Sequence, residues 1–157
     1  MTLGYRYTLR REWTFGTGRV CWVMLNPSTA DDTADDPTIR RVVRFSQDAG
    51  FQRLVVVNLF AARSTKPKHL TEMDDPVGEK NGVTMKAAFV TSHAVVFAWG
   101  SWYAANAHRV VTPIMPYGMA LRAGHVPSCL GHTIDGSPRH PLYVKADQPL
   151  IPYGVGM

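Results

Sequence analysis

The chain has 157 residues, of which 45% are hydrophobic and 18% charged, with a formal net charge of +5. This length and composition predict one globular domain over residues 1–157, long enough to bury a sizeable core. No apolar run reaches the roughly 20 residues of a membrane helix, and the N-terminal "MTLGYRYTLRREW" lacks the apolar centre of a signal peptide. We therefore expect a cytoplasmic monomer with neither a membrane nor an obligate protein partner.

Positive charge gathers in the first 68 residues, at Arg6, Arg10, Arg11, Arg40, Arg41, Arg44, Arg63, Lys66 and Lys68. Such a balance favours phosphate-bearing partners, because contacts with phosphates release counterions. The two cysteines, Cys21 and Cys129, lie far apart without CxxC or Cys/His spacing. They predict buried thiols rather than a disulfide framework, a zinc site or an iron–sulfur cluster, so we expect no cofactor and no metal.

The first third of the chain predicts strands followed by a helix. "YRYTLRREW", the turn-rich "TFGTG" and "RVCWVML" predict a β-hairpin that leads into a buried strand. Asp36 and Pro37 then begin a helix, as its N-cap and first residue, and Gly50 ends it. Ile39, Val42, Val43 and Ser46 recur at helical spacing along one face of this helix.

Strands and helices alternate through the rest of the chain. "RLVVVNLF" is typical of a parallel strand covered on both faces. A polar loop leads to a second helix, which starts at Asp75-Pro76 and runs to about Ser92. "AVVFAWG" predicts a buried strand, "SWYAANAHRVV" a helix, and "HVPSCLGHT" a last strand before the loop "DGSPRHPLYV". This alternation predicts a three-layer α/β sandwich around a central, mostly parallel sheet.

Small polar residues follow the predicted strands. Asn26-Pro27-Ser28 ends one strand, Asn58 stands near the end of the next, and Gly100-Ser101 follows a third. Ligands bind at the carboxyl ends of such strands, so these groups and His140 are candidates for one crevice. Amides, hydroxyls and an imidazole suit a neutral heterocycle rather than a metal. The acidic run Asp31, Asp32, Asp35 and Asp36 is typical of a solvated loop with a helix cap.

Four stretches, "MLNPSTAD", "VVVNLF", "FAWG" and "GSPRHPLYV", resemble the shared motifs of an uncharacterised domain family found in bacteria and phages. This likeness extends from about Val23 to Tyr143. More distantly, the same stretches resemble motifs of the uracil-DNA glycosylase superfamily, in the same order. The second resemblance implies a uracil-DNA-glycosylase-like domain that hydrolyses the N-glycosidic bond of a pyrimidine base in DNA.

The superfamily motifs imply roles for three residues. Asn26 would position a water molecule, Asn58 would read the Watson–Crick edge of an extruded base, and His140 would stabilise the departing base. Around them, Pro27, Ser28, Gly100 and Ser101 complete the expected base site. The uracil-specific enzymes place a tyrosine where this chain has Ser28, so the resemblance implies a mismatched or 5-modified pyrimidine.

Binding of duplex DNA requires basic side chains for phosphates and an apolar wedge. The candidates are Arg63, Lys66, Lys68 and Arg139 for phosphates, Leu142 or Tyr143 for the wedge, and Phe45, Phe60 or Trp102 for stacking on the base. Two alternatives remain open: an enzyme acting on free nucleotides, and a non-catalytic module that binds a modified base. Taken singly, Asn26 also fits a turn-forming residue and His140 a loop histidine.

Overall fold

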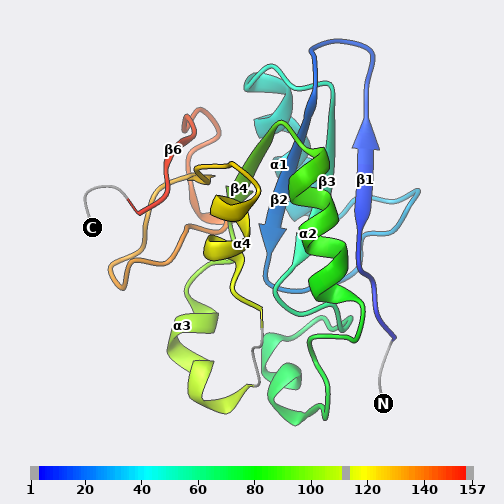
Figure 1. Ribbon diagram of the computed structural model, residues 1–157, viewed down its shortest axis with the longest axis vertical. Coiled ribbons are helices and arrows are strands. Elements are labelled where there is room, and N and C mark those ends of the chain that lie inside the picture. Colours follow the sequence, from blue (N-terminus) through cyan, green and yellow to red (C-terminus); the bar gives the residue numbers. More distant parts are fainter. Residues whose placement is uncertain (1–3, 111–113, 155–157) are drawn as a thin grey trace.

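The computed structural model describes residues 4–110 and 114–154, in which six strands form one sheet (Figure 1). The strands are β1 (Leu9–Glu12), β2 (Arg19–Met24), β3 (Arg53–Asn58), β4 (Ala94–Phe97), β5 (Ser128–Cys129) and β6 (Ile151–Pro152), in the spatial order β1-β3-β2-β4-β5-β6. β3, β2, β4 and β5 run parallel to one another, whereas β1 and β6 are antiparallel at the edges. The chain is therefore an α/β protein, as predicted, with a mixed sheet.

The predicted N-terminal β-hairpin is wrong. β1 pairs with β3, where Leu9 lies opposite Val56, while β2 pairs with β3 and β4. The reason lies in burial, because β2 is buried at every residue after Arg19 and needs a partner on each side. In β1, by contrast, Arg10 and Glu12 are exposed, so this strand takes the edge.

The helices are α1 (Pro37–Asp48), α2 (Asn81–Thr91), α3 (Trp102–Asn106) and α4 (Pro116–Arg122), with short 3₁₀ helices η1 (Pro67–Glu72), η2 (Ala107–Arg109) and η3 (Pro141–Tyr143). α1 begins as predicted, since Asp36 Oδ1 accepts a 2.8 Å hydrogen bond from the Ile39 amide. The second Asp-Pro start is wrong, because the Asp75 carboxylate accepts from the Gly78 amide and closes a turn before α2. The predicted helix over 101–111 is divided into α3 and η2, and Val111 lies outside the described residues.

Two hydrophobic clusters cover opposite faces of the sheet. Alternate strand residues such as Cys21, Val55 and Phe97 join α2 and α4 in one cluster. The residues between them, such as Trp22 and Val56, join α1 in the other. Figure 1 shows α1 and α2 on the two sides of the sheet. Because both faces are covered, the carboxyl ends of the central strands are the natural place for a ligand.

Cys21 and Cys129 are free, buried thiols, as predicted. Burial raises the pKa of Cys21 to about 12 and also raises the pKa of Cys129. Protonated buried thiols act as small apolar side chains rather than nucleophiles. In the described ranges, no helix is both long enough and apolar enough to cross a membrane.

Candidate functional site

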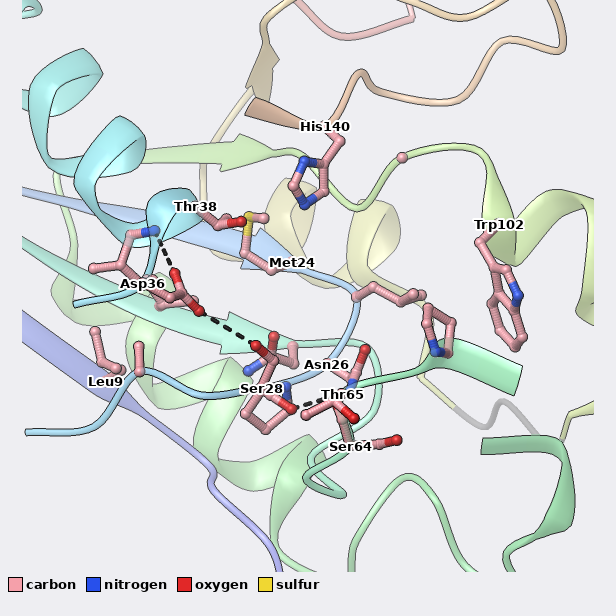
Figure 2. A pocket seen from close by; sticks show the side chains of 18 of the residues that line it. Leu9, Met24, Asn26, Ser28, Asp36, Thr38, Ser64, Thr65, Trp102 and His140 are labelled. Carbon is pink, nitrogen blue, oxygen red and sulfur yellow. Dashed lines mark hydrogen bonds between the residues drawn. The ribbon is translucent and has the colours of Figure 1, made fainter. Parts of the chain in front are cut away.

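A cavity of about 370 Å³ lies at the carboxyl ends of β2, β3 and β4 (Figure 2). Its walls include Asn26, Pro27 and Ser28 after β2, Asn58 at the end of β3, and Gly100 and Ser101 after β4. Arg139, His140 and Tyr143 reach it from the late loop. This volume is at the lower end of the roughly 300–1,000 Å³ of small-ligand sites. The structure thus brings together Asn26 and His140, proposed for the reaction, and the five residues of the expected base site.

The side-chain amide of Asn26 is fixed in one orientation. Its Nδ2 donates to the main-chain oxygens of Pro27 at 3.0 Å and Ser64 at 2.9 Å. Because the two carbonyls occupy the amino group, the remaining polar atom is Oδ1, which Figure 2 shows on the cavity side. A turn-forming role accounts for the amino group but leaves Oδ1 free to accept a hydrogen bond from a water molecule or a ligand.

Asn58 lines the cavity, and its side-chain amide is not used in a hydrogen bond within the described residues. The residue is 3% exposed, and none of the described residues forms a hydrogen bond with its side chain. Its main-chain oxygen accepts a 2.9 Å bond from Asn81 Nδ2, which also donates to the Leu59 oxygen. Among the described residues, the buried side-chain atom without a hydrogen-bond partner is Asn81 Oδ1, so the Asn58 amide atoms are accessible from the cavity. The side chain therefore offers a donor and an acceptor to a ligand from a firmly held backbone.

The imidazole of His140 is a neutral hydrogen-bond donor. Its Nδ1 accepts a 3.2 Å bond from the Leu142 amide, so the ring proton of the neutral form resides on Nε2. Burial lowers the pKa of His140, while the negative charge of Asp36 partly raises it. In Figure 2 the ring extends from the late loop toward Met24 and Thr38 in the cavity. Nε2–H is thus available to an acceptor on a ligand.

The lowered pKa of His140 makes a prediction for stability. The unfolded chain binds this proton more readily, near the ordinary histidine pKa of about 6.5. The contribution of the neutral His140 imidazole to the free energy of unfolding is therefore complete above that pH. This contribution is lost as the pH falls toward the lower folded-state pKa. We expect the free energy of unfolding to fall more steeply from pH 7 to 5 in the wild type than in His140→Gln. Urea denaturation at several pH values tests this, and parallel pH curves would contradict it.

Arg41 on α1 holds the loop that carries His140. Its Nε donates to the Pro141 oxygen at 3.1 Å, its Nη2 donates to the Val144 oxygen, and its guanidinium lies 5.7 Å from the centre of the Phe45 ring. On the other side, the Gly100 amide donates to the Pro138 oxygen at 2.8 Å. Gly100 has a φ of +79°, and a Cβ there would lie 3.4 Å from the Cβ of His140. The loop is therefore fixed between α1 and the end of β4.

We expect Arg41→Lys to loosen this loop, because an ammonium group cannot replace the two-point contact of the guanidinium. Amide hydrogen exchange at Leu142 and Tyr143 should accelerate, because the Pro141 and Val144 oxygens lose the donors that they share. Arg44→Lys is the matched control, since Arg44 is exposed on the same helix and its ion pair among the described residues is with Asp48. Equal rates of amide hydrogen exchange in Arg41→Lys and Arg44→Lys would contradict the positioning role of Arg41.

The cavity also contains residues that the sequence did not indicate. Asp36, expected only as a helix cap, lines the cavity, and its Oδ2 accepts a 3.3 Å bond from the Ser28 hydroxyl. Arg6, Thr38 and Ser64 line it as well. The sequence did contain a signal that could have placed Asp36 in the cavity, since it starts a helix only ten residues after Asn26. No local pattern marked the other three.

The predicted DNA contacts and stacking residues divide into two groups. Arg139 and Tyr143 line the cavity, whereas Arg63, Lys66, Lys68 and Leu142 lie outside its lining. Of the three aromatic candidates, Trp102 lines the cavity. Phe45 and Phe60 are buried in the core clusters on the two faces of the sheet and are excluded as stacking residues.

Comparison with known proteins identifies one family. Residues 6–142 match the family model described as "Protein of unknown function (DUF1643)". No curated protein and no solved structure matches the chain. In the part of the chain that the structure describes, no three His, Cys, Asp or Glu side chains are grouped to share a metal ion. Because the family model covers most of the sequence, the chain belongs to the DUF1643 family.

Proposed function

We propose that this protein is a DNA glycosylase-like enzyme that hydrolyses the N-glycosidic bond of a mismatched or 5-modified pyrimidine in DNA. One observation carries the proposal: Asn26, Asn58 and His140, remote in the sequence, line a single cavity of about 370 Å³. Each presents the group that the reaction needs. The proposal includes a uracil-DNA-glycosylase-like, three-layer fold, and the four parallel central strands support that part.

The groups around the cavity fit the charges that develop in the reaction. As the glycosidic bond breaks, the base gains negative charge and the sugar gains positive charge. Nε2–H of neutral His140 donates to the base oxygen, and this bond is stronger in the transition state than in the ground state. Asn26 Oδ1 accepts a hydrogen bond from the attacking water. An amide orients water but is a poor base, so bond breaking runs ahead of water attack.

Ser28 determines how much room the base has. It lines the cavity directly after Asn26-Pro27, and its hydroxyl is turned toward Asp36. A serine in this place leaves space for a substituent at the pyrimidine 5-position, which a tyrosine would fill. Asn58 then discriminates among bases by the donors and acceptors on their Watson–Crick edges.

The DNA backbone is proposed to lie across the mouth of the cavity. Arg139 is exposed there, and Lys66 and Lys68 are exposed near the segment of Ser64. Tyr143 and Leu142 are 78% and 41% exposed in η3, where either side chain can fill the space left by an extruded base. The phosphate contacts come from Arg63, Lys66, Lys68 and Arg139, and such contacts make binding depend on salt.

The test is a panel of oligonucleotides that carry plain uracil, thymine opposite guanine and several 5-substituted pyrimidines. Abasic-site formation and duplex binding are measured together. We expect abasic sites from at least one mismatched or 5-substituted base. Release of uracil alone would overturn the 5-substituent assignment. Tight, salt-dependent binding without abasic sites would indicate a base-binding module, and turnover of free nucleosides without duplex binding would indicate a nucleotide enzyme.

A further inference from the structure

Asp36 is the only acidic residue among the described residues that line the cavity. Its carboxylate is held by two donors, the Ile39 amide at 2.8 Å and the Ser28 hydroxyl at 3.3 Å (Figure 2). Both donors are neutral. The ion pairs of the described residues, Arg11 with Asp35 and Arg44 with Asp48, do not include Asp36. The cavity therefore contains one carboxylate that is not engaged in an ion pair of the described residues, alongside the guanidinium groups of Arg6 and Arg139.

The position of this charge follows from the local fold. Asp36 caps α1 from an extended backbone conformation, and Pro37 fixes the next residue. The Ser28 hydroxyl ties the carboxylate to the segment that follows Asn26-Pro27. Asp36 also acts electrostatically on His140, because its charge opposes the effect of burial on the pKa of that ring. The carboxylate thus lies in the same cavity as the proposed water-orienting amide and leaving-group donor.

We propose that Asp36 stabilises the positively charged sugar that forms as the base departs. This inference rests on the proposed function and adds a catalytic residue to it. Asn26 is neutral and cannot supply the negative charge that a dissociating glycosidic bond requires on the sugar side. A carboxylate in a partly buried site does so through a Coulomb interaction that water screens only in part.

The reaction balances with these groups. The bond between sugar C1′ and the base nitrogen breaks, and its electron pair leaves with the base, whose oxygen accepts a hydrogen bond from His140. The water held by Asn26 adds to C1′ and loses one proton to Asp36, which returns it to solvent. The departing base takes up one proton from solvent, so the sum is hydrolysis to an abasic sugar and a neutral base.

The same charge limits what the cavity accepts. A carboxylate repels a phosphate, so the phosphates of a nucleotide are excluded from the Asp36 wall, and Arg6 and Arg139 are the cationic side chains of the lining that could contact them. The part of the ligand at the Asp36 wall is the sugar, which gains positive charge as the base departs. Duplexes that carry an abasic-site analogue test this preference: one analogue is a pyrrolidine ring, which is protonated at neutral pH, and the other is a neutral tetrahydrofuran ring of the same size.

We expect the wild type to bind the pyrrolidine duplex roughly tenfold more tightly than the tetrahydrofuran duplex, the size of one partly screened charge contact. Asp36→Asn should bind the two alike. Asparagine is also a good N-cap, so the variant keeps α1 and loses the charge. Asp35→Asn is the matched control, because Asp35 is an exposed neighbour outside the cavity lining, and it should keep the wild-type preference.

The outcomes separate this inference from the proposed function. If the wild type makes no abasic sites but prefers the pyrrolidine duplex, and Asp36→Asn removes that preference, the enzymatic function fails and the charge assignment stands. If abasic sites form but Asp36→Asn keeps the preference, or the wild type has none, the role of Asp36 is overturned and the function stands. Abasic-site formation should fall by roughly 10²-fold in Asp36→Asn.

Discussion

Replacement of His140 by alanine is expected to slow base release by roughly 10²–10³-fold, the usual cost of a lost hydrogen bond to a developing anion. Duplex binding should change by less than about threefold, because Nε2–H contributes mainly in the transition state. The reason is geometric: the Leu142 amide occupies Nδ1, so the only ring donor faces the cavity. Single-turnover formation of abasic sites, with binding measured in parallel, checks both numbers.

Dependence on the leaving group separates chemistry from misfolding in His140→Ala. Bases whose 5-substituents withdraw electrons leave as more stable anions and need the donor less, so they should lose less rate than uracil does. A purely structural defect would slow all bases by the same factor. His108→Ala serves as the control, since His108 is an exposed histidine of η2 outside the cavity lining. Uniform loss across the panel would contradict the role given to His140.

Local signals in the sequence were sufficient for the central part of the fold. Asp36-Pro37 marked the start of α1 because both cap chemistry and proline geometry act within a few residues. Apolar runs marked β2, β3 and β4, since buried central strands are apolar on both faces. The same runs placed Asn26 and Asn58 at adjacent strand ends, and the parallel pairing of β2 with β3 brings these ends together.

Features that depend on distant contacts were not predictable. β1 pairs with β3 and not with β2, its neighbour in sequence. The buried strand β2 lies between β3 and β4, and this arrangement outweighs the local preference of the turn for a hairpin. β5 lies within "HVPSCLGHT", where the last strand was predicted, but the sheet continues to β6, a two-residue strand without a pattern of its own. The late loop owes its position to Arg41, one hundred residues before Pro141. Asp36 was assigned to a helix cap alone, since its second contact, with Ser28, exists only once the segment between them is folded.

Asn58 and Asn81 differ in what their side-chain amides contact. The Asn58 side chain has no hydrogen-bond partner among the described residues, whereas Asn81 Nδ2 donates to the main-chain oxygens of Asn58 and Leu59. We therefore expect Asn58→Ala to change the free energy of unfolding by no more than about 0.5 kcal/mol, because no protein hydrogen bond is lost. The variant should nevertheless release all accepted bases at similar rates.

Asn81→Ala should do the reverse. It leaves two buried carbonyls short of a donor, which costs about 1–3 kcal/mol. Removal of the buried Asn81 Oδ1, which has no partner in the described residues, offsets part of that cost, so we expect a loss in the lower half of this range. The preference of Asn81→Ala among bases should persist, because this variant keeps the Asn58 side chain. Urea denaturation and release rates across the oligonucleotide panel measure both effects. If Asn58→Ala destabilises the protein as much as Asn81→Ala and keeps base preference, the role of Asn58 is structural, and other groups of the cavity recognise the base.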